Sequence, residues 1–338
     1  MKSKKLIILF SVLFLMTACG KNDVDSPEKK ENKTEQKSNN QNNSEEKEES
    51  EEVSFEVEGT NAPKDQGDLQ VWFEGKIELE GNKVIAKGVT NLLPESRLTL
   101  DISPEEGTFI GGDGSGNVDS NGTFEIEAGV PDGFEGLLHV ELSFKTGDQS
   151  DDKIKEHYSE GIKGGFARIY YDSYEDEMYS KASFRNTIVF DGQSQSFSII
   201  EPEWNKPDDL GNPTVWMKPT VEKFEDYVVI KIESNLIEDT FIRGTADIPN
   251  YITTGFSGST YINPDGTATM YIKDPEKDSR IKGVSKYDIK IEVDPADGNN
   301  GKHVIEAYGE NGERLSGDLV YKKDDGKAIS QKVTISMD

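Results

Sequence analysis

An internal repeat is the feature that most limits the folds open to this chain. Val71-Trp72 recurs as Val215-Trp216, 144 residues later. Further matches at the same separation are Val84–Lys87 with Val228–Lys231, Asn91-Leu92 with Asn235-Leu236, and Asn121-Gly122-Thr123 with Asp265-Gly266-Thr267. The separation then grows by about six residues, so that Tyr158 corresponds to Tyr308. Such ordered self-similarity predicts two copies of one domain.

A proline-bearing segment separates the two copies. Pro202, Pro207 and Pro213 fall within a short polar stretch, where each proline removes a backbone donor and fixes φ. We therefore predict a first domain over 69–200, a linker over 201–212 and a second domain over 213–338.

Both copies have the short alternating pattern of β-strands. Apolar and polar residues alternate in segments bounded by turn residues, such as 93–96 and Asn121-Gly122. The predicted strands are 83–89, 97–102, 122–127 and 139–144 in the first copy, and 227–232, 240–243, 267–272, 287–293, 304–308 and 333–336 in the second. About seven short strands per copy indicate an all-β fold of two antiparallel sandwiches. Trp72, Trp216, Tyr158 and Tyr308 are expected to be core or corner residues.

The turn signals also carry a family resemblance. The segment from Thr90 to Leu98, followed by Asn121-Gly122-Thr123-Phe124, resembles the immunoglobulin-like domains repeated in bacterial surface proteins. The second copy keeps Ser234-Asn235-Leu236 but has Glu238 in place of the proline. The resemblance covers most of 69–338 and implies an immunoglobulin-like sandwich, a fold that serves adhesion, spacing and ligand binding and has no single activity.

The first residues read as a secretion signal. Lys2, Lys4 and Lys5 precede thirteen uncharged, mostly apolar residues, 6–18, a run too short for a transmembrane helix and suited to a signal peptide. The following Met16-Thr17-Ala18-Cys19-Gly20 resembles the bacterial lipobox, which implies removal of 1–18 and lipidation of Cys19, for example by palmitate. The alternative is an ordinary signal peptide. The resemblance implies a Gram-positive-type lipoprotein held by its lipid on the extracytoplasmic face of the cell membrane.

A polar tether follows the lipobox. Lys, Glu, Asn, Gln and Ser dominate the segment 20–52, which contains no aromatic residue. Such a composition buries too little apolar area to offset the entropy of ordering, so we expect a disordered linker over 19–68.

Composition excludes several functions. The 338 residues carry 65 Asp and Glu against 38 Lys and Arg, a net charge of −27, which argues against nucleic-acid binding because phosphates require a basic surface. One Cys excludes an internal disulfide. No nucleophile elbow, zinc-protease motif or phosphate-binding glycine loop occurs, and His157 is placed on a strand or loop at the surface or a corner.

A glycine-rich segment, 111–122, is a weak candidate for a metal site. Oxygen-bearing side chains alternate along it at Asp113, Ser115, Asn117, Asp119 and Asn121, and Ca²⁺ prefers six to eight oxygen ligands. The EF-hand pattern fails, because Val118 stands where glycine is required. The favoured interpretation is a hairpin whose Gly and Asn supply turn geometry, so we expect no cofactor.

A second candidate is a tyrosine-rich hairpin over 168–179. Its four tyrosines are a candidate partner-binding site because interfaces favour Tyr; they are Tyr170, Tyr171, Tyr174 and Tyr179. The corresponding segment of the second copy, 320–327, is shorter and basic. The alternative is that alternate tyrosines cover the sandwich while the acidic residues face solvent.

The function expected from the sequence is non-catalytic. We predict a surface module that binds an unknown extracellular protein or envelope polymer, or that acts as a spacer. The alternatives are an accessory or substrate-binding subunit of an envelope enzyme or transporter, and a hydrolase with an unrecognised site.

Overall fold

The computed structural model describes residues 61–252 and 254–337. The predicted signal segment 1–18, the lipidation site Cys19 and the tether as far as residue 60 lie outside the described residues. Within the described part of the chain, no helix is both long enough and apolar enough to cross a membrane.

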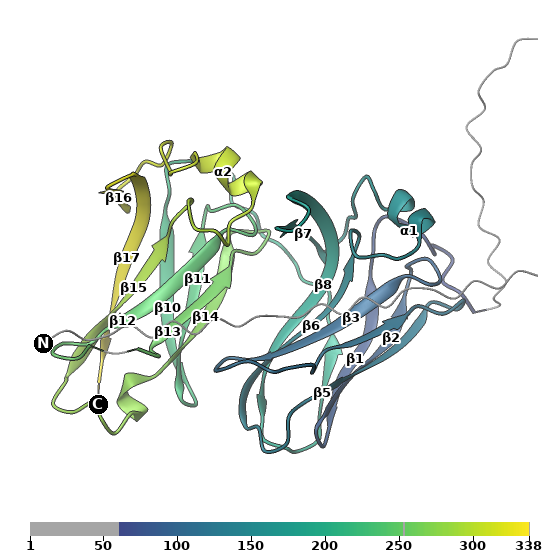
Figure 1. Ribbon diagram of the computed structural model, residues 1–338, viewed down its shortest axis with the longest axis horizontal. Helices are drawn as coiled ribbons and strands as arrows, with labels where there is room; N and C mark the ends of the chain where they lie inside the picture. Colours follow the sequence, from purple (N-terminus) through teal and green to yellow (C-terminus); the bar gives the residue numbers. More distant parts are fainter. Residues whose placement is uncertain (1–60, 253, 338) are drawn as a thin grey trace, which may run out of the picture. The chain divides into compact units, whose positions relative to one another are not determined.

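The first half of the described chain is built almost entirely of strands (Figure 1). Its elements are β1 (Phe73–Glu80), β2 (Lys83–Thr90), β3 (Arg97–Pro104), β4 (Gly114–Asn117), β5 (Thr123–Gly129), β6 (Gly136–Lys145), α1 (Asp152–His157), β7 (Ala167–Asp172), β8 (Glu177–Phe190) and β9 (Gln195–Ile199). They form one sheet in the order β5-β2-β1-β9 and another in the order β4-β3-β6-β8-β7.

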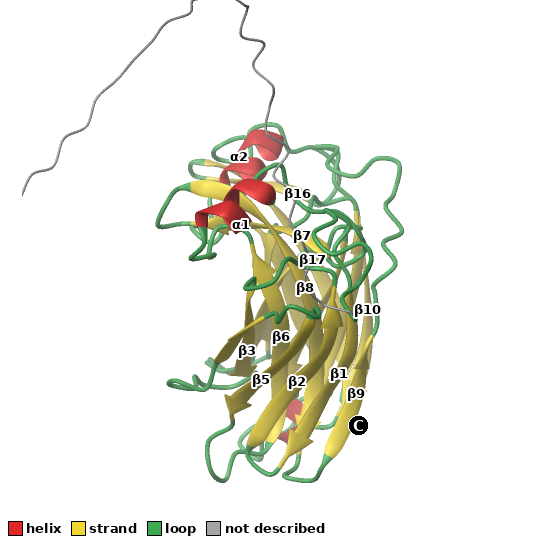
Figure 2. Ribbon diagram, turned by 90° about the vertical axis from the view of Figure 1, so that its right-hand side faces the viewer, coloured by secondary structure: helices red, strands yellow, loops and turns green. Residues whose placement is uncertain are grey.

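The second half repeats this order without a counterpart of β9 and with an added 3-10 helix, η1. Its elements are β10 (Met217–Phe224), β11 (Tyr227–Ser234), β12 (Phe241–Asp247), β13 (Ser257–Tyr261), β14 (Thr267–Lys273), η1 (Pro275–Lys277), β15 (Lys286–Val293), α2 (Lys302–Tyr308), β16 (Val320–Lys323) and β17 (Gly326–Ser336). The sheets are β10-β11-β14 and β13-β12-β15-β17-β16. Strands dominate the view in Figure 2. The prediction of an all-β fold with antiparallel sheets is confirmed.

Alternation along the strands explains why the sheets pack in pairs. In β5 every second side chain is buried, namely Phe124, Ile126 and Ala128, while the residues between them are exposed. One apolar face per strand forces each sheet to cover another. Each sandwich accordingly has its own cluster of buried apolar side chains, one between Val71 and Ile199 and one between Val215 and Ile335.

The predicted strand 304–308 is wrong, because this segment is helix α2. Val304 and Tyr308 lie four residues apart and are both fully buried, which is the spacing of one helical face and not of a strand. Gly309 ends the helix at φ 92°. The same arrangement recurs in α1, so His157 belongs to a helix and not to a strand or loop.

The tyrosine prediction is confirmed, and the tryptophans lie at the edge of the sandwiches, with Trp72 packed against the first core. Tyr158 and Tyr308 are buried, and their hydroxyls accept hydrogen bonds from the Leu93 and Ile237 backbone N–H groups at 3.1 and 3.0 Å. The two tryptophans are only partly buried and precede the first strand of each sandwich. Their indole N–H groups donate to carboxylates seven residues earlier, Trp72 to Asp65 at 2.8 Å and Trp216 to Asp209 at 2.9 Å.

A buried asparagine holds the entry to the first sandwich. Asn91 is 0% exposed, and its Oδ1 accepts the Trp72 N–H at 3.1 Å while its Nδ2 donates to the Gln70 carbonyl at 2.9 Å. Its own carbonyl accepts the Gly67 N–H at 2.6 Å. A buried amide satisfied in this way fixes the path of two segments at once.

The second sandwich reproduces this asparagine. Asn235 Oδ1 accepts the Trp216 N–H at 3.1 Å, Nδ2 donates to the Thr214 carbonyl at 3.0 Å, and the Asn235 carbonyl accepts the Gly211 N–H at 2.7 Å. These bonds attach Gly211 to the second sandwich and Gly67 to the first. We infer that the second sandwich begins at about 207 instead of the predicted 213, and the first at about 63 instead of the predicted 69.

We predict that Asn91→Ala lowers the free energy of unfolding of the first sandwich by about 2–4 kcal/mol, because the Trp72 N–H and the Gln70 C=O lose their partner and a fully buried side chain is removed. Urea denaturation of the 61–338 fragment measures the change. Asn117→Ala is the control, since that side chain is exposed and donates to Glu95 at 3.1 Å. A loss no larger than that of the control would show that the asparagine is not a structural anchor.

The revised boundary makes a second prediction. A fragment 207–338 should be more stable than 213–338 by about 2 kcal/mol, because the shorter one removes the Asp209 carboxylate that accepts the Trp216 indole N–H. Chemical denaturation of both fragments tests this. If the two fragments have equal free energies of unfolding, residues 207–212 belong to the linker and not to the second sandwich.

Candidate functional site

The four tyrosines of the predicted partner site lie on the β7–β8 hairpin but do not form one surface. Tyr170 pairs with Tyr179 across the hairpin, and their rings stack at 5.8 Å. Tyr179 donates its hydroxyl to Glu175, whereas Tyr171 donates to Asp176 at 2.6 Å. Tyr174, at the turn, is 96% exposed.

One face of this hairpin contacts the second sandwich. Lys302 Nζ lies 2.9 Å from the Asp176 carboxylate and donates to the Asp176 carbonyl at 2.6 Å. A side chain at Gly301 would come within 2.8 Å of Tyr171 Cβ. Tyr171 therefore serves an intramolecular contact, and Tyr174 is the tyrosine that remains open to solvent.

The weak metal candidates form an edge strand and its flanking turns. Ser115 and Asn117 belong to β4, which pairs with β3. Asp113 accepts the Ile102 N–H at 3.0 Å, and Asp119 accepts the Asn121 and Thr123 N–H groups at 2.8 Å each. These bonds account for the acidic side chains as turn and strand caps. Among residues 61–252 and 254–337 no group of three His, Cys, Asp or Glu is placed to hold a metal ion.

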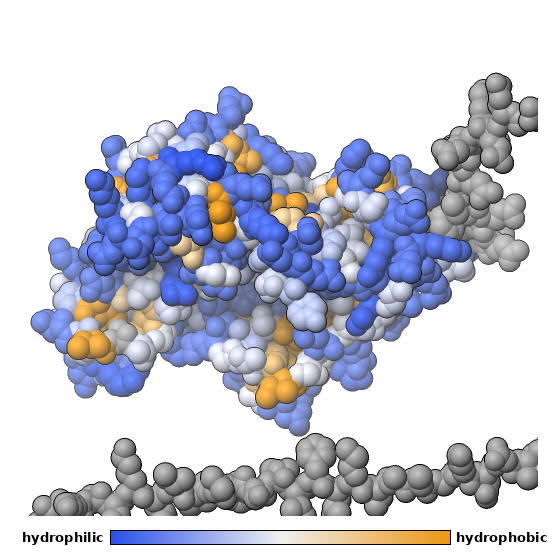
Figure 3. All heavy atoms as spheres, turned by 45° about the horizontal axis from the view of Figure 1, so that its top comes forward, coloured by the Kyte–Doolittle hydropathy of each residue, from blue (hydrophilic) through white to orange (hydrophobic). Residues whose placement is uncertain are grey.

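A polar cleft of about 820 Å³ is the strongest candidate site. Its floor is the outward face of β3, β6 and β8, and its other wall comes from β13 and β14. Carboxylate, guanidinium, hydroxyl and aromatic groups share the lining. Hydrophilic residues cover most of the face drawn in Figure 3, and apolar residues appear there in small separate groups.

Glu141 is the central charge of the cleft floor. Its carboxylate lies 2.8 Å from Lys181 Nζ, 3.1 Å from Arg185 Nε and 2.7 Å from Ser183 Oγ. Burial by itself would raise the pKa of Glu141, but attraction to Arg185 and Lys181 outweighs burial, so the pKa is lowered. Glu141 is therefore held ionised and is a poor proton donor.

Arg168 is the cleft cation with a free donor. Its side chain is 8% exposed, its Nη1 donates to Asn263 Oδ1 at 3.0 Å, and its guanidinium lies 4.8 Å from the centre of the Trp204 ring. Its buried Nε has no hydrogen-bond partner among the described residues. Burial, assisted by repulsion from Arg185, lowers the pKa of Arg168 to about 10, so it remains charged at neutral pH. An unpartnered buried donor is costly unless a ligand or water satisfies it.

A loop of the second sandwich supplies acidic groups beside this cluster. Glu238 Oε1 accepts the Ile169 N–H at 3.0 Å. Burial raises the pKa of Asp239 to about 6, although attraction to Lys181, Arg185 and Arg168 opposes the rise. The same loop of the first sandwich carries Pro94 and an exposed Glu95 instead.

Aromatic side chains line the opposite wall. Tyr271 lies with its ring 5.8 Å from His139, whose Nε2 is 2.5 Å from Glu105 and whose Nδ1 is 2.9 Å from Thr187. Tyr261, on the edge strand β13, is half-buried. The cleft thus combines aromatic rings with hydrogen-bond donors and hydrogen-bond acceptors.

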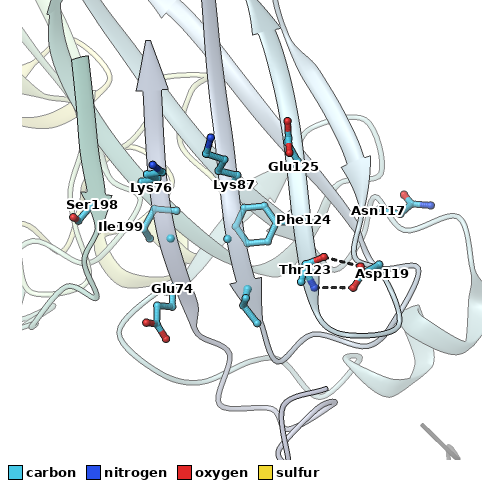
Figure 4. A pocket seen from close by; sticks show the side chains of 13 residues that line it. Glu74, Lys76, Lys87, Asn117, Asp119, Thr123, Phe124, Glu125, Ser198 and Ile199 are labelled. Atoms are coloured by element: carbon cyan, nitrogen blue, oxygen red, sulfur yellow. Dashed lines mark hydrogen bonds between the residues drawn. The ribbon is translucent and has the colours of Figure 1, made fainter. Parts of the chain in front are cut away.

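A second hollow, of about 930 Å³, lies on the other sheet of the first sandwich (Figure 4). Lys76, Lys87 and Glu125 stand on three neighbouring strands, with Phe124 beside them. Glu78 forms ion pairs with both lysines. The charges of this second hollow therefore pair with one another within the sheet. We favour the polar cleft as the candidate binding site, because the cleft-lining Arg168 has a nitrogen without a hydrogen-bond partner in the described chain.

Sequence reasoning did not find the cleft. Its groups come from strands far apart in the chain, and none forms a motif. One signal was available: Glu238 interrupts the repeat where the first copy has Pro94, and this substitution lies at the contact between the two sandwiches.

Comparison with protein-family models gave no match, and comparison with curated proteins gave none either. Among solved structures, the D0-D1 domain of Intimin is similar to this chain at 8% identity and a TM-score of 0.18, with 63% of this chain and 85% of that chain covered. A likeness of this size does not assign the chain to a family.

We predict that Asp239 makes the stability of the chain pH-dependent. Its raised folded-state pKa means that folding favours the protonated acid, so its stabilising contribution is present below about pH 4 and is lost as pH rises through about 6. Asp239→Asn keeps a neutral side chain that tolerates the observed φ of 61°. The free energy of unfolding of the variant should therefore rise relative to that of the wild type as the pH is raised from about 5 to about 7.5.

Urea midpoints at the two pH values measure this difference. Glu95→Gln, at the corresponding exposed position of the first sandwich, is the control. If the difference in urea midpoint between Asp239→Asn and the wild type is the same at both pH values, the raised pKa of Asp239 is contradicted.

Proposed function

We propose that this chain is a bacterial surface lipoprotein, anchored through Cys19 to the extracytoplasmic face of the cell membrane, whose two sandwiches form a non-catalytic binding module. The observation that carries the binding role is the polar cleft with the buried, incompletely partnered Arg168. The partner is an extracellular protein or an envelope polymer, and a nucleic acid is disfavoured by the net charge of −27.

The central carboxylate of the cleft favours binding over hydrolysis. A general acid needs a proton near neutral pH, whereas two cations hold Glu141 ionised. Immunoglobulin-like sandwiches serve many binding roles, so the fold agrees with this choice without deciding it.

The anchor is tested by Cys19→Ser. We expect the variant to lose lipoprotein processing and to appear in the medium or as an uncleaved precursor, because stable attachment requires more than one acyl chain and these are expected on Cys19. Cell fractionation and labelling with a fatty-acid analogue measure both effects. Normal processing and membrane retention of the variant would overturn the lipid anchor.

The binding role is tested separately with the fluorescently labelled 61–338 fragment on purified cell envelopes of the source bacterium. We expect saturable binding, because the fragment retains the whole cleft. The Glu95→Gln fragment, altered outside the cleft, should bind equally well. Binding that never saturates, or that is absent, would leave the module without a binding function.

A further inference from the structure

The cleft restricts the kind of ligand that it can hold. Its lining carries the acids Asp101, Glu105, Asp113 and Glu141 against the cations Arg168 and Arg185. The acids exceed the cations, so a polyanion such as a phosphate polymer would be repelled. A bare cation is disfavoured as well, since no group of three potential ligands converges anywhere in the part of the chain that the structure describes.

The neutral groups of the cleft point to a hydroxyl-rich ligand. Ser103, Thr187, Ser259, Thr260 and Thr269 line it with groups that both donate and accept hydrogen bonds. Trp204, Tyr261 and Tyr271 add aromatic surface. A ligand that is complementary to these hydroxyls and to these aromatic rings must carry many hydroxyls and an apolar ring face.

Arg168 supplies the anchoring contact. Its Nε is a charged donor, buried and without a partner among the described residues, and the guanidinium is held in place by Asn263 and by the Trp204 ring. A hydroxyl or carbonyl oxygen that contacts this guanidinium from the cleft would form a charge-assisted hydrogen bond with a cation whose hydrogen-bonding capacity is incompletely used.

We propose that this cleft binds an uncharged saccharide, with a sugar oxygen accepting a hydrogen bond from the Arg168 guanidinium and a sugar ring lying against Tyr261. This proposal rests on the binding function proposed above and specifies its ligand class. An extended peptide is the weaker alternative, because peptides that add to a sheet draw their affinity from main-chain hydrogen bonds, whereas the free donor here belongs to a side chain.

Isothermal titration of the 61–338 fragment with the tetramer of N-acetylglucosamine, with maltotetraose and with cellotetraose tests the proposal. We expect at least one to bind. Arg168→Met should weaken binding by about tenfold or more, the loss expected for one charge-assisted hydrogen bond. Tyr261→Ser should weaken it by about threefold to tenfold through loss of ring contact.

Arg243→Met is the matched control. Arg243 is also an arginine beside an aromatic ring, 5.6 Å from the centre of Phe241, but it is exposed and does not line the cleft. It should leave saccharide affinity unchanged. Circular dichroism melting identifies any variant that fails to fold. If Arg168→Met fails to fold, Tyr261→Ser still tests the proposal, because Tyr261 lies on an edge strand.

The outcomes separate the two proposals. If the fragment binds envelopes but none of the three oligosaccharides, the saccharide proposal is overturned and the binding function stands. Binding of a saccharide with equal affinity to the wild type, Arg168→Met and Tyr261→Ser would overturn the location. A synthetic acidic peptide that binds in an Arg168-dependent manner when no saccharide does would replace the saccharide by a peptide ligand.

Discussion

The buried asparagine of each sandwich is the contact on which the rest of the domain depends. Asn91 and Asn235 tie the segment that enters the sandwich to the end of its second strand, through bonds to backbone groups on both sides. Each also sits close to the tryptophan whose indole N–H holds the preceding turn. Because these amides are fully enclosed, their bonds cannot be exchanged for water, and the chain path at the entry is set by them.

The two copies share these contacts and differ where they meet. The conserved geometry of asparagine, tryptophan and buried helix tyrosine builds each sandwich separately around its own core. The contact between them instead uses residues that break the repeat, including Glu238 in place of Pro94 and the long β7–β8 hairpin with Asp176. Within one chain, the departures from the repeat therefore mark the surfaces that do more than maintain the fold.

The cleft is lined by residues of both sandwiches. Burying Arg168, Lys181 and Glu141 costs free energy that a structural interface of apolar residues would avoid. The cluster satisfies most of its groups internally but leaves one guanidinium donor open. In this acidic protein the cleft brings cations, hydroxyls and aromatic rings together, and we locate binding there.

The sequence by itself determined the duplication, the all-β class and the positions of most strands, because alternation, turn residues and repeats are local signals. The strand expected at 304–308 was wrong because a single pair of buried residues four apart, Val304 and Tyr308, outweighs a short alternating pattern once a core is present to receive them. The predicted tyrosine site was only a composition signal, and the structure divides those side chains between a stacked pair, a contact between sandwiches and one exposed turn residue. Only the tertiary structure could reveal the cleft, since Glu141, Arg168 and Asn263 are brought together by sheet pairing and by the meeting of two domains, neither of which leaves a pattern in the order of residues along the chain.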